Sequence, residues 1–377
     1  MLGRLLRAHL KPYTRSLGLV VVLQTIQIVA ALSLPAITSD IIDEGVLVGD
    51  NGVIRREGLL MLGLSFVQGA FAIAAVYVGS RVAMAVGRDM RSSLFHRVTS
   101  FSAREVGAFG APSLITRITN DVQQVQMFVV MACTMAIAAP ITIVIGVVMA
   151  AGEAVSLSWV LAVSIPLAAV VLGSIVVRMV PAFRRMQDLI DEVNRILREQ
   201  IAGIRVVRAF VREPQERARF AVANEDLTRT SLTAGRLMSS MFPMVNLLVN
   251  GTSVAVLWVG ADRVSDGTIA VGPLIAYLSY LVQILMSVVM ATWLLGMVPR
   301  SSVAAGRIQE VLDTETSVVP PSTPVRALVS PGTLEMRGVG FHYPGAEHSV
   351  LSGISFRTEP GRTTAIIGST GAGKTTL

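Results

Sequence analysis

The sequence is poor in charge, cysteine and lysine, and the shortages of charge and cysteine each exclude a class of protein. Only 15% of the 377 residues are charged, where a soluble domain carries about 25%. Disorder is excluded as well, because 52% of the residues are apolar and can bury surface. The single cysteine, Cys133, excludes a disulfide scaffold. The net charge of +7 is spread between apolar runs, so we expect no nucleic-acid partner.

Lysine occurs only at Lys11 and Lys374, against 30 arginines. A bias on this scale indicates genome composition rather than function. It also makes a motif that requires lysine rarer by chance, so any such motif in this chain carries more weight.

Long apolar runs dominate what the sequence does contain. Six runs of 19 to 26 residues hold no charged side chain, and about 20 helical residues cross a bilayer. A single central charge costs about 2.5–3.5 kcal/mol, so the runs predict membrane spans rather than buried helices of a soluble protein. Prolines in or at the start of five of them are either hinges or static bends. The predicted spans are 17–37, 59–80, 127–150, 159–177, 241–260 and 273–298.

The basic residues predict how these spans are oriented. Residues 1–16, 81–126 and 181–240 together hold 21 arginines and lysines. The three remaining connections between spans, 38–58, 151–158 and 261–272, together hold three. Basic connections stay in the cytoplasm. We therefore expect a multi-pass protein of the plasma membrane, with its N-terminus, both long connections and its C-terminal region cytoplasmic.

The two long connections keep a helical pattern. Residues 81–126 are interrupted around Gly107, Gly110 and Pro112, and 181–240 near Glu213–Pro214. Each pattern predicts a helix that leaves the membrane, turns and returns. Such a hairpin either transmits displacement from a soluble domain or only connects two spans.

The composition changes after the sixth span. We assign residues 1–312 to the transmembrane domain, the proline-rich stretch 313–332 to a linker, and 333–377 to the start of an α/β domain. Alternating apolar residues from Leu334 to Tyr343 predict one strand, and 364–367 predicts a second, buried one.

That second predicted strand leads into a glycine-rich phosphate-binding motif. Glycines allow backbone N–H groups to surround phosphates, Lys374 would reach the β- and γ-phosphates, and the Thr375 hydroxyl would bind Mg²⁺. Tyr343 either packs in a core or stacks on a base. The expected cofactors are therefore ATP and Mg²⁺, held by Tyr343, Gly368, Ser369, Thr370, Gly371, Ala372, Gly373, Lys374, Thr375 and Thr376.

Several stretches make the whole chain resemble an ABC exporter half-transporter of the multidrug and lipid type, most closely a subunit of bacterial heterodimeric multidrug exporters. They are 113–122 (SLITRITNDV), 192–199 (EVNRILRE), 203–210 (GIRVVRAF), 302–308 (SVAAGRI) and 341–344 (FHYP). The resemblance implies an all-α six-helix transmembrane domain with long cytoplasmic helical hairpins, followed by the start of an α/β P-loop ATPase domain.

Further expectations come from the same resemblance. It implies a second half-transporter as partner, in a homodimer or a heterodimer, and makes Tyr343 a base contact. Short coupling helices are expected near Val106–Gly110 and Arg212–Gln215. The family's signature motif, Asp–Glu strand and switch histidine would follow Leu377, so we expect an N-terminal fragment that does not hydrolyse ATP alone.

Two functions remain open at this point. The first is ATP-driven export of hydrophobic small molecules, drugs or lipids, as one half of a dimer in the lipid bilayer. The second is a nucleotide-binding, non-hydrolysing regulatory subunit of a heterodimer. Uncharged polar and aromatic residues in the spans either line a substrate cavity or pack between helices: Gln24, Gln27, Gln68, Asn246, Asn250, Tyr277, Tyr280, Gln283 and Trp293.

Overall fold

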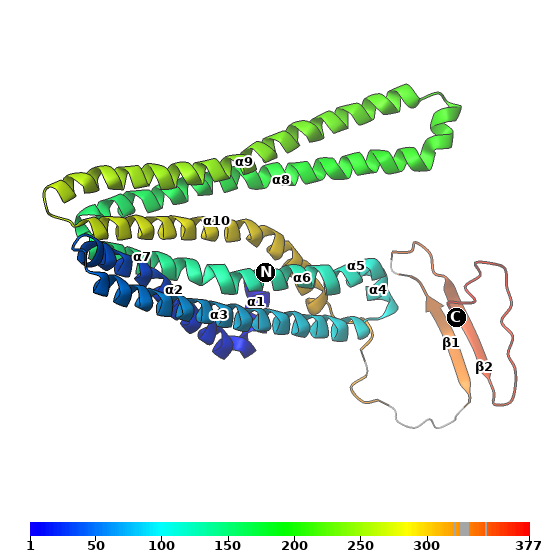
Figure 1. The fold of residues 1–377 in the computed structure, drawn as a ribbon. Coiled ribbons are helices and arrows are strands. Elements are labelled where there is room, and N and C mark those ends of the chain that lie inside the picture. Colours follow the sequence, from blue (N-terminus) through cyan, green and yellow to red (C-terminus); the bar gives the residue numbers. More distant parts are fainter. Residues whose placement is uncertain (320, 325–331, 344) are drawn as a thin grey trace. The chain divides into compact units, whose positions relative to one another are not determined.

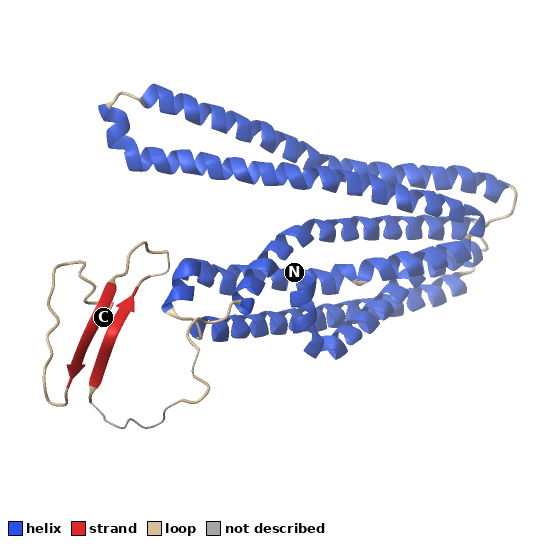
Figure 2. Cartoon of the chain, turned by 180° about the vertical axis from the view of Figure 1, so that it is seen from behind, coloured by secondary structure: helices blue, strands red, loops and turns tan. Residues whose placement is uncertain are grey.

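Helices make up most of the chain up to residue 313 in the computed structural model, which describes residues 1–319, 321–324, 332–343 and 345–377 (Figures 1 and 2). Short 3-10 and π-helical turns join several of the α-helices. The α-helices are α1 (Leu2–Leu10), α2 (Thr14–Asp40), α3 (Asn51–Thr99), α4 (Ala103–Phe109), α5 (Ala111–Thr116), α6 (Val122–Met131), α7 (Ala138–Glu153), α8 (Ser158–Ala209), α9 (Glu213–Ser265) and α10 (Val271–Asp313).

Within the described residues, six helical stretches are long and apolar enough to cross a membrane, and each contains one predicted span. This confirms the predicted all-α six-helix architecture. The helices extend well beyond the predicted spans, since α3 has 49 residues, α8 has 52 and α9 has 53. At 1.5 Å per residue each of these helices is roughly 75–80 Å long, far more than the ~30 Å apolar core of a bilayer.

A polar side chain of α2 covers backbone carbonyls in the irregular turn that precedes the proline of α7. Pro140 lies in α7, just after a π-helical turn at Ala132–Ala136. The buried Gln24 of α2 donates from Nε2 to the carbonyl oxygens of Cys133 (2.7 Å) and Thr134 (3.2 Å) in that turn. A neighbouring side chain thus covers carbonyls in an irregular part of a membrane helix.

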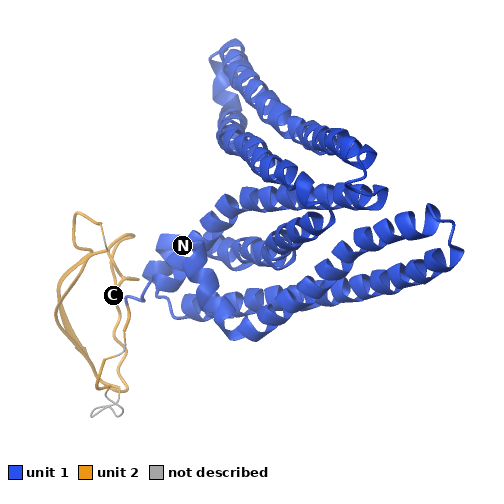
Figure 3. Ribbon diagram, turned by 90° about the vertical axis from the view of Figure 1, so that its left-hand side faces the viewer, with its two compact units in different colours: residues 1–317 blue, residues 318–377 orange. Residues whose placement is uncertain are grey.

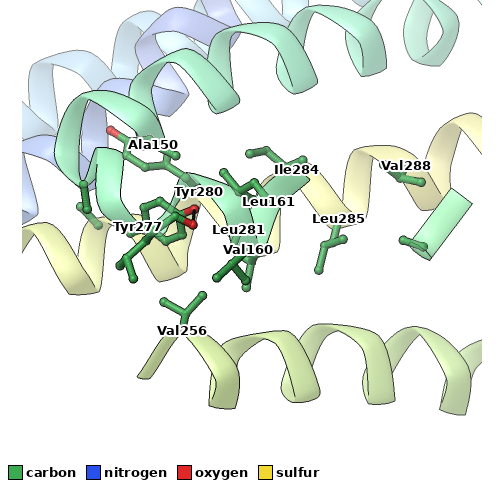
Figure 4. Close-up of a cluster of buried hydrophobic side chains, with 14 of the residues drawn as sticks. Ala150, Val160, Leu161, Val256, Tyr277, Tyr280, Leu281, Ile284, Leu285 and Val288 are labelled. Atoms are coloured by element: carbon green, nitrogen blue, oxygen red, sulfur yellow. Dashed lines mark hydrogen bonds between the residues drawn. The ribbon is translucent and has the colours of Figure 1, made fainter. Parts of the chain in front are cut away.

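One apolar core joins α2, α7, α8, α9 and α10 around Tyr277 and Tyr280 (Figure 4). Tyr277 donates a hydrogen bond to the carbonyl oxygen of Leu157 at 2.7 Å. Gly146 of α7 allows a close approach, because a Cβ atom there would lie 2.9 Å from Ile284 Cγ1. Small residues at such crossings let membrane helices pack closely.

A second apolar core lies among α1, α3, α5, α6 and α10. Its buried members include Leu5, Val86, Leu114, Val122 and Ile308. The first cytoplasmic hairpin is therefore folded against the end of α10 within a single chain.

The chain divides into two compact units, residues 1–317 and 318–377 (Figure 3). Part of the expected linker 313–332, namely residues 320 and 325–331, lies outside the described residues. In the second unit β1 (Leu334–Phe341) pairs antiparallel with β2 (Leu351–Thr358). The sequence pattern did not indicate β2.

The predicted strand at 364–367 is wrong, because these residues form no regular structure in the second unit. Ile367 is 91% exposed. A buried parallel strand needs neighbours that cover both of its faces, and the described part of this chain provides none for it.

Candidate functional site

The phosphate-loop residues form a tight glycine-dependent bend. Gly371 and Gly373 have φ angles of 88° and 81°, values that glycine adopts without steric cost. At Gly373 a Cβ atom would also lie 3.0 Å from Leu351 Cδ2 and 3.2 Å from the Val350 carbonyl oxygen. Any larger residue would therefore be strained by both its backbone angle and its contacts.

Lys374 closes the loop on itself. Its Nζ donates to the carbonyl oxygens of Gly368 (2.9 Å) and Ser369 (2.7 Å). Lys374 itself lies in a turn, which is closed by the Thr376 N–H bonded to the Gly373 carbonyl oxygen at 3.0 Å. Glycine conformation, an exposed ammonium group and exposed hydroxyls together fit a phosphate-bearing ligand with its metal ion.

Tyr343 lies beside the same loop, although 33 residues separate it from Thr376. Its hydroxyl is 3.3 Å from the Thr376 Oγ1, and its ring meets Phe341 edge-on with centroids 5.1 Å apart. Tyr343 is 51% exposed, so its ring is not enclosed in a core.

The first cytoplasmic hairpin ends in α4, which begins three residues before the expected position and is capped at its start. Ser102 and Glu105 form a capping box, in which the Ser102 N–H donates to Glu105 Oε2 at 2.8 Å. The other carboxylate oxygen accepts from the N–H of Ser317, beyond the end of α10, at 3.3 Å. Hydrogen bonding from Ser102, and then from Ser317, lowers the pKa of Glu105 to about 2.

Four charged residues, which we call the arginine network, fix the returning arm of this hairpin to α10: Arg117, Asp121, Arg307 and Glu310. Arg117 donates from Nη1 to the Arg307 carbonyl oxygen (2.8 Å) and to Glu310 Oε2 (2.7 Å). Arg307 Nε lies 3.3 Å from Asp121 Oδ2. Arg117 and Asp121 are buried.

The network unites two of the sequence stretches that carried the family resemblance, 113–122 and 302–308. Aromatic residues extend it towards α4, since the Arg117 guanidinium lies 4.8 Å from the Phe109 ring centroid. Phe109 stacks on Phe101. Opposite charges in the two stretches were the only signal in the sequence for this pairing.

The second hairpin, α8 and α9, turns without a separate short helix. The coupling helix expected at Arg212–Gln215 is absent as an element of its own, because α9 already begins at Glu213. Val211 in the turn has a φ angle of 54°, which is costly for a β-branched residue. Apolar side chains are exposed at this tip, including Ile201 (76%) and Phe210 (73%).

A cavity of about 590 Å³, here called the methionine cavity, opens between α8, α9 and α10. Five methionines line it together with aromatic rings, one of which is Trp293. Among the candidate polar residues, Tyr277, Tyr280 and Gln24 are instead buried in helix packing. The methionines are Met179, Met238, Met241, Met286 and Met297.

Comparison with known proteins agrees with this architecture. Residues 17–288 match the family described as ABC transporter transmembrane region. The whole chain is 47% identical to an uncharacterized ABC transporter ATP-binding protein of Mycobacterium tuberculosis, of which it spans 65%.

Two more distant relatives carry functional names. A multidrug efflux ATP-binding/permease protein of Mycobacterium bovis is 28% identical over 99% of the chain, which covers 31% of that protein. An ATP-dependent lipid A-core flippase of Thiobacillus denitrificans is 27% identical over the whole chain, which covers 64% of that protein. The family match covers well over half of the chain, which is therefore a multi-pass membrane protein that belongs to the ABC transporter transmembrane-region family.

Proposed function

We propose that this chain is part of an ATP-driven exporter of hydrophobic small molecules, drugs or lipids, and works as one of two half-transporters. The observation that supports this most strongly is the presence, in one chain, of six apolar spans and a glycine-dependent phosphate loop. The names of the multidrug and lipid relatives support the substrate class.

The phosphate loop is the proposed nucleotide site. Gly368, Gly371 and Gly373 would bring backbone N–H groups to the phosphates, Lys374 would exchange its loop carbonyl partners for phosphate oxygens, and Thr375 would bind Mg²⁺. Tyr343 would stack on the base. When bound, ATP would supply the free energy for export through its hydrolysis. The loop residues would position its phosphates and stabilise their negative charge.

The first hairpin is the proposed route from the nucleotide site to the membrane. Its tip, α4, is tied by Glu105 to the backbone at Ser317, and its returning arm is tied to α10 by the arginine network. A push on α4 would therefore move α10, which carries the sixth predicted span. This is rigid-body transmission through a buried contact.

The methionine cavity is the proposed substrate site. Methionine side chains are flexible and polarizable, so a cavity lined by them adapts to different apolar ligands. Its volume lies within the range of small-molecule sites. Phe242 lines this cavity and Phe66 of α3 does not, although both side chains are largely exposed in the single chain, at 73% and 78%. In the intact dimer, Phe242→Ala should reduce dye export while Phe66→Ala should not.

Lys374→Ala in the complete gene product with its partner, reconstituted in vesicles, tests the proposed function. We expect normal membrane insertion with ATP-driven export lost, because the phosphates lose their cation. Arg362→Ala is the matched control, since it removes another exposed positive charge that lies outside the loop. Unchanged export in Lys374→Ala would contradict the proposal.

A further inference from the structure

Helix α1 has two unlike faces. Leu2 and Leu5 are 8% and 1% exposed and pack in the second core with residues of α3 and α10. Arg4 and Arg7 of α1 are exposed, as is Lys11, which begins the 3-10 turn Lys11–Tyr13 directly after it. Their spacing of three and four residues places the three side chains on one side of the segment. One face is thus fixed to the protein, while the other presents three cations.

The cationic side chains border one shallow hollow at the surface. Arg4, Arg7 and Lys11 line one shallow hollow of about 460 Å³ together with Gly3 and Ala8. A Cβ atom at Gly3 would meet nothing within 4 Å, so the backbone is open to close approach between the long side chains.

The three cations also lack counter-charges. Helix α1 contains no acidic residue. In the part of the chain that the structure describes, no ion pair or side-chain hydrogen bond involves Arg4, Arg7 or Lys11. The site therefore favours an anion from outside the chain.

The position of α1 indicates which anion this is. It directly precedes α2, whose apolar span begins at residue 17, so under the proposed topology α1 lies at the cytoplasmic boundary of the bilayer. The three cations extend over roughly 10 Å of helix, a length that suits adjacent headgroups in a leaflet. We propose that Arg4, Arg7 and Lys11 bind the phosphate groups of anionic lipids in the cytoplasmic leaflet.

This site has a structural consequence for α10. The buried face of α1 packs in the same core as Ala304, Ala305 and Ile308, next to the arginine network. Lipid bound at the outer face would therefore hold α1 against the helix to which the first hairpin is fixed. The inference rests on the membrane orientation of the proposed function.

The scarcity of lysine provides a direct test. The chain has only two lysines, so a neutral amine-reactive reagent followed by peptide mass spectrometry can report Lys11 while Lys374 serves as the internal reference. The whole chain is reconstituted in vesicles of phosphatidylcholine alone or with phosphatidylglycerol. We expect phosphatidylglycerol to slow labelling of Lys11 severalfold and to leave Lys374 unchanged.

Variants identify the residues responsible. Arg4→Gln with Arg7→Gln should weaken the binding of anionic lipid by roughly fivefold for each arginine lost, and should therefore remove the protection of Lys11. Arg205→Gln with Arg208→Gln removes the same charge from the far part of α8, where both side chains are exposed, and should leave the protection intact.

Two outcomes would overturn the lipid site. One is equal labelling of Lys11 in the two kinds of vesicle, and the other is equal protection by soluble glycerol phosphate added to phosphatidylcholine vesicles. Neither outcome affects the export proposal, which would fail instead if Lys374 were labelled only from the face opposite the N-terminus.

Discussion

The two cytoplasmic hairpins are built in opposite ways. The first is fixed to its own chain by buried contacts, with Arg117 and Asp121 enclosed against α10. The second extends from the bundle as two arms that diverge towards the tip (Figure 1). Its ion pairs, such as Arg195 with Glu192 and Glu199, lie at the surface.

This difference indicates where each hairpin finds its partner. Exposed ion pairs contribute little to stability, and exposed Ile201 and Phe210 leave apolar surface uncovered at the second tip. The first hairpin packs against its own chain. The second leaves apolar side chains exposed, and in the proposed dimer these would be available to contact the other subunit.

The largest effect should come from breaking the arginine network. Arg117→Met removes charge-assisted hydrogen bonds to Glu310 and to the Arg307 carbonyl oxygen, so we expect unfolding to become easier by about 3 kcal/mol. Thermal unfolding in detergent measures this. The matched change in the second hairpin, Arg195→Met, should leave the midpoint temperature of unfolding unchanged. Equal losses of stability in the two variants would show that the two hairpins are not fixed differently.

Backbone conformation at the two tips gives the next largest contrast. Gly110 has a φ angle of 75°, and Val211 has 54°. Gly110→Val should destabilise the chain by about 1–3 kcal/mol, the usual cost of such strain, whereas Val211→Gly relieves strain and should cost nothing. Chemical denaturation of both variants tests the pair. A stable Gly110→Val protein would show that the first tip is not held rigidly.

The capping carboxylate predicts a pH effect at the first tip. Because the folded-state pKa of Glu105 is about 2, below the usual value of about 4.3, its stabilising effect is complete above that usual value and is lost as pH falls towards 2. Protease cleavage near α4 should therefore be faster in Glu105→Gln than in the parent at pH 7, with the difference shrinking below about pH 4. Ser102→Ala removes the cap, so it should raise the pH at which the stabilisation by Glu105 is lost. A difference in cleavage rate between Glu105→Gln and the parent that stays constant at all pH values would exclude this role of Glu105.

The smallest effect is expected at the second tip. Phe210→Ser should change the stability of the chain alone by less than about 0.5 kcal/mol, as for other exposed sites, but should weaken assembly of the intact dimer. Light scattering measures assembly of the dimer, and unfolding curves measure the stability of the chain. Phe109→Ser is the contrasting variant, because Phe109 stacks on Phe101 and contacts Arg117. If Phe210→Ser unfolded the chain as readily, the second tip would be packed within its own subunit.

The sequence predicts what short-range physics controls in this protein. Uncharged runs fix the spans, and breaks at Gly107 and Gly110 locate the first tip within a few residues. Arg117 and Glu310 are 193 residues apart, so only the fold reveals that they pair. The predicted strand at 364–367 failed because its stability depends on neighbouring strands rather than on its own apolar residues.

Helix α10 runs from Val271 to Asp313 with Pro299 inside it, so a single helix connects the methionine cavity to the arginine network. Each residue turns an α-helix by about 100°, so the bearing of Arg307 relative to the cavity residue Trp293 is set by the count between them. One residue inserted between them would rotate Arg307 and Glu310 by about 100° and shift them by about 1.5 Å along the axis. Seven would nearly restore the direction but would shift both side chains by roughly 10 Å, out of reach of Asp121 and Arg117. The cavity and the arginine network therefore together fix the length of this segment.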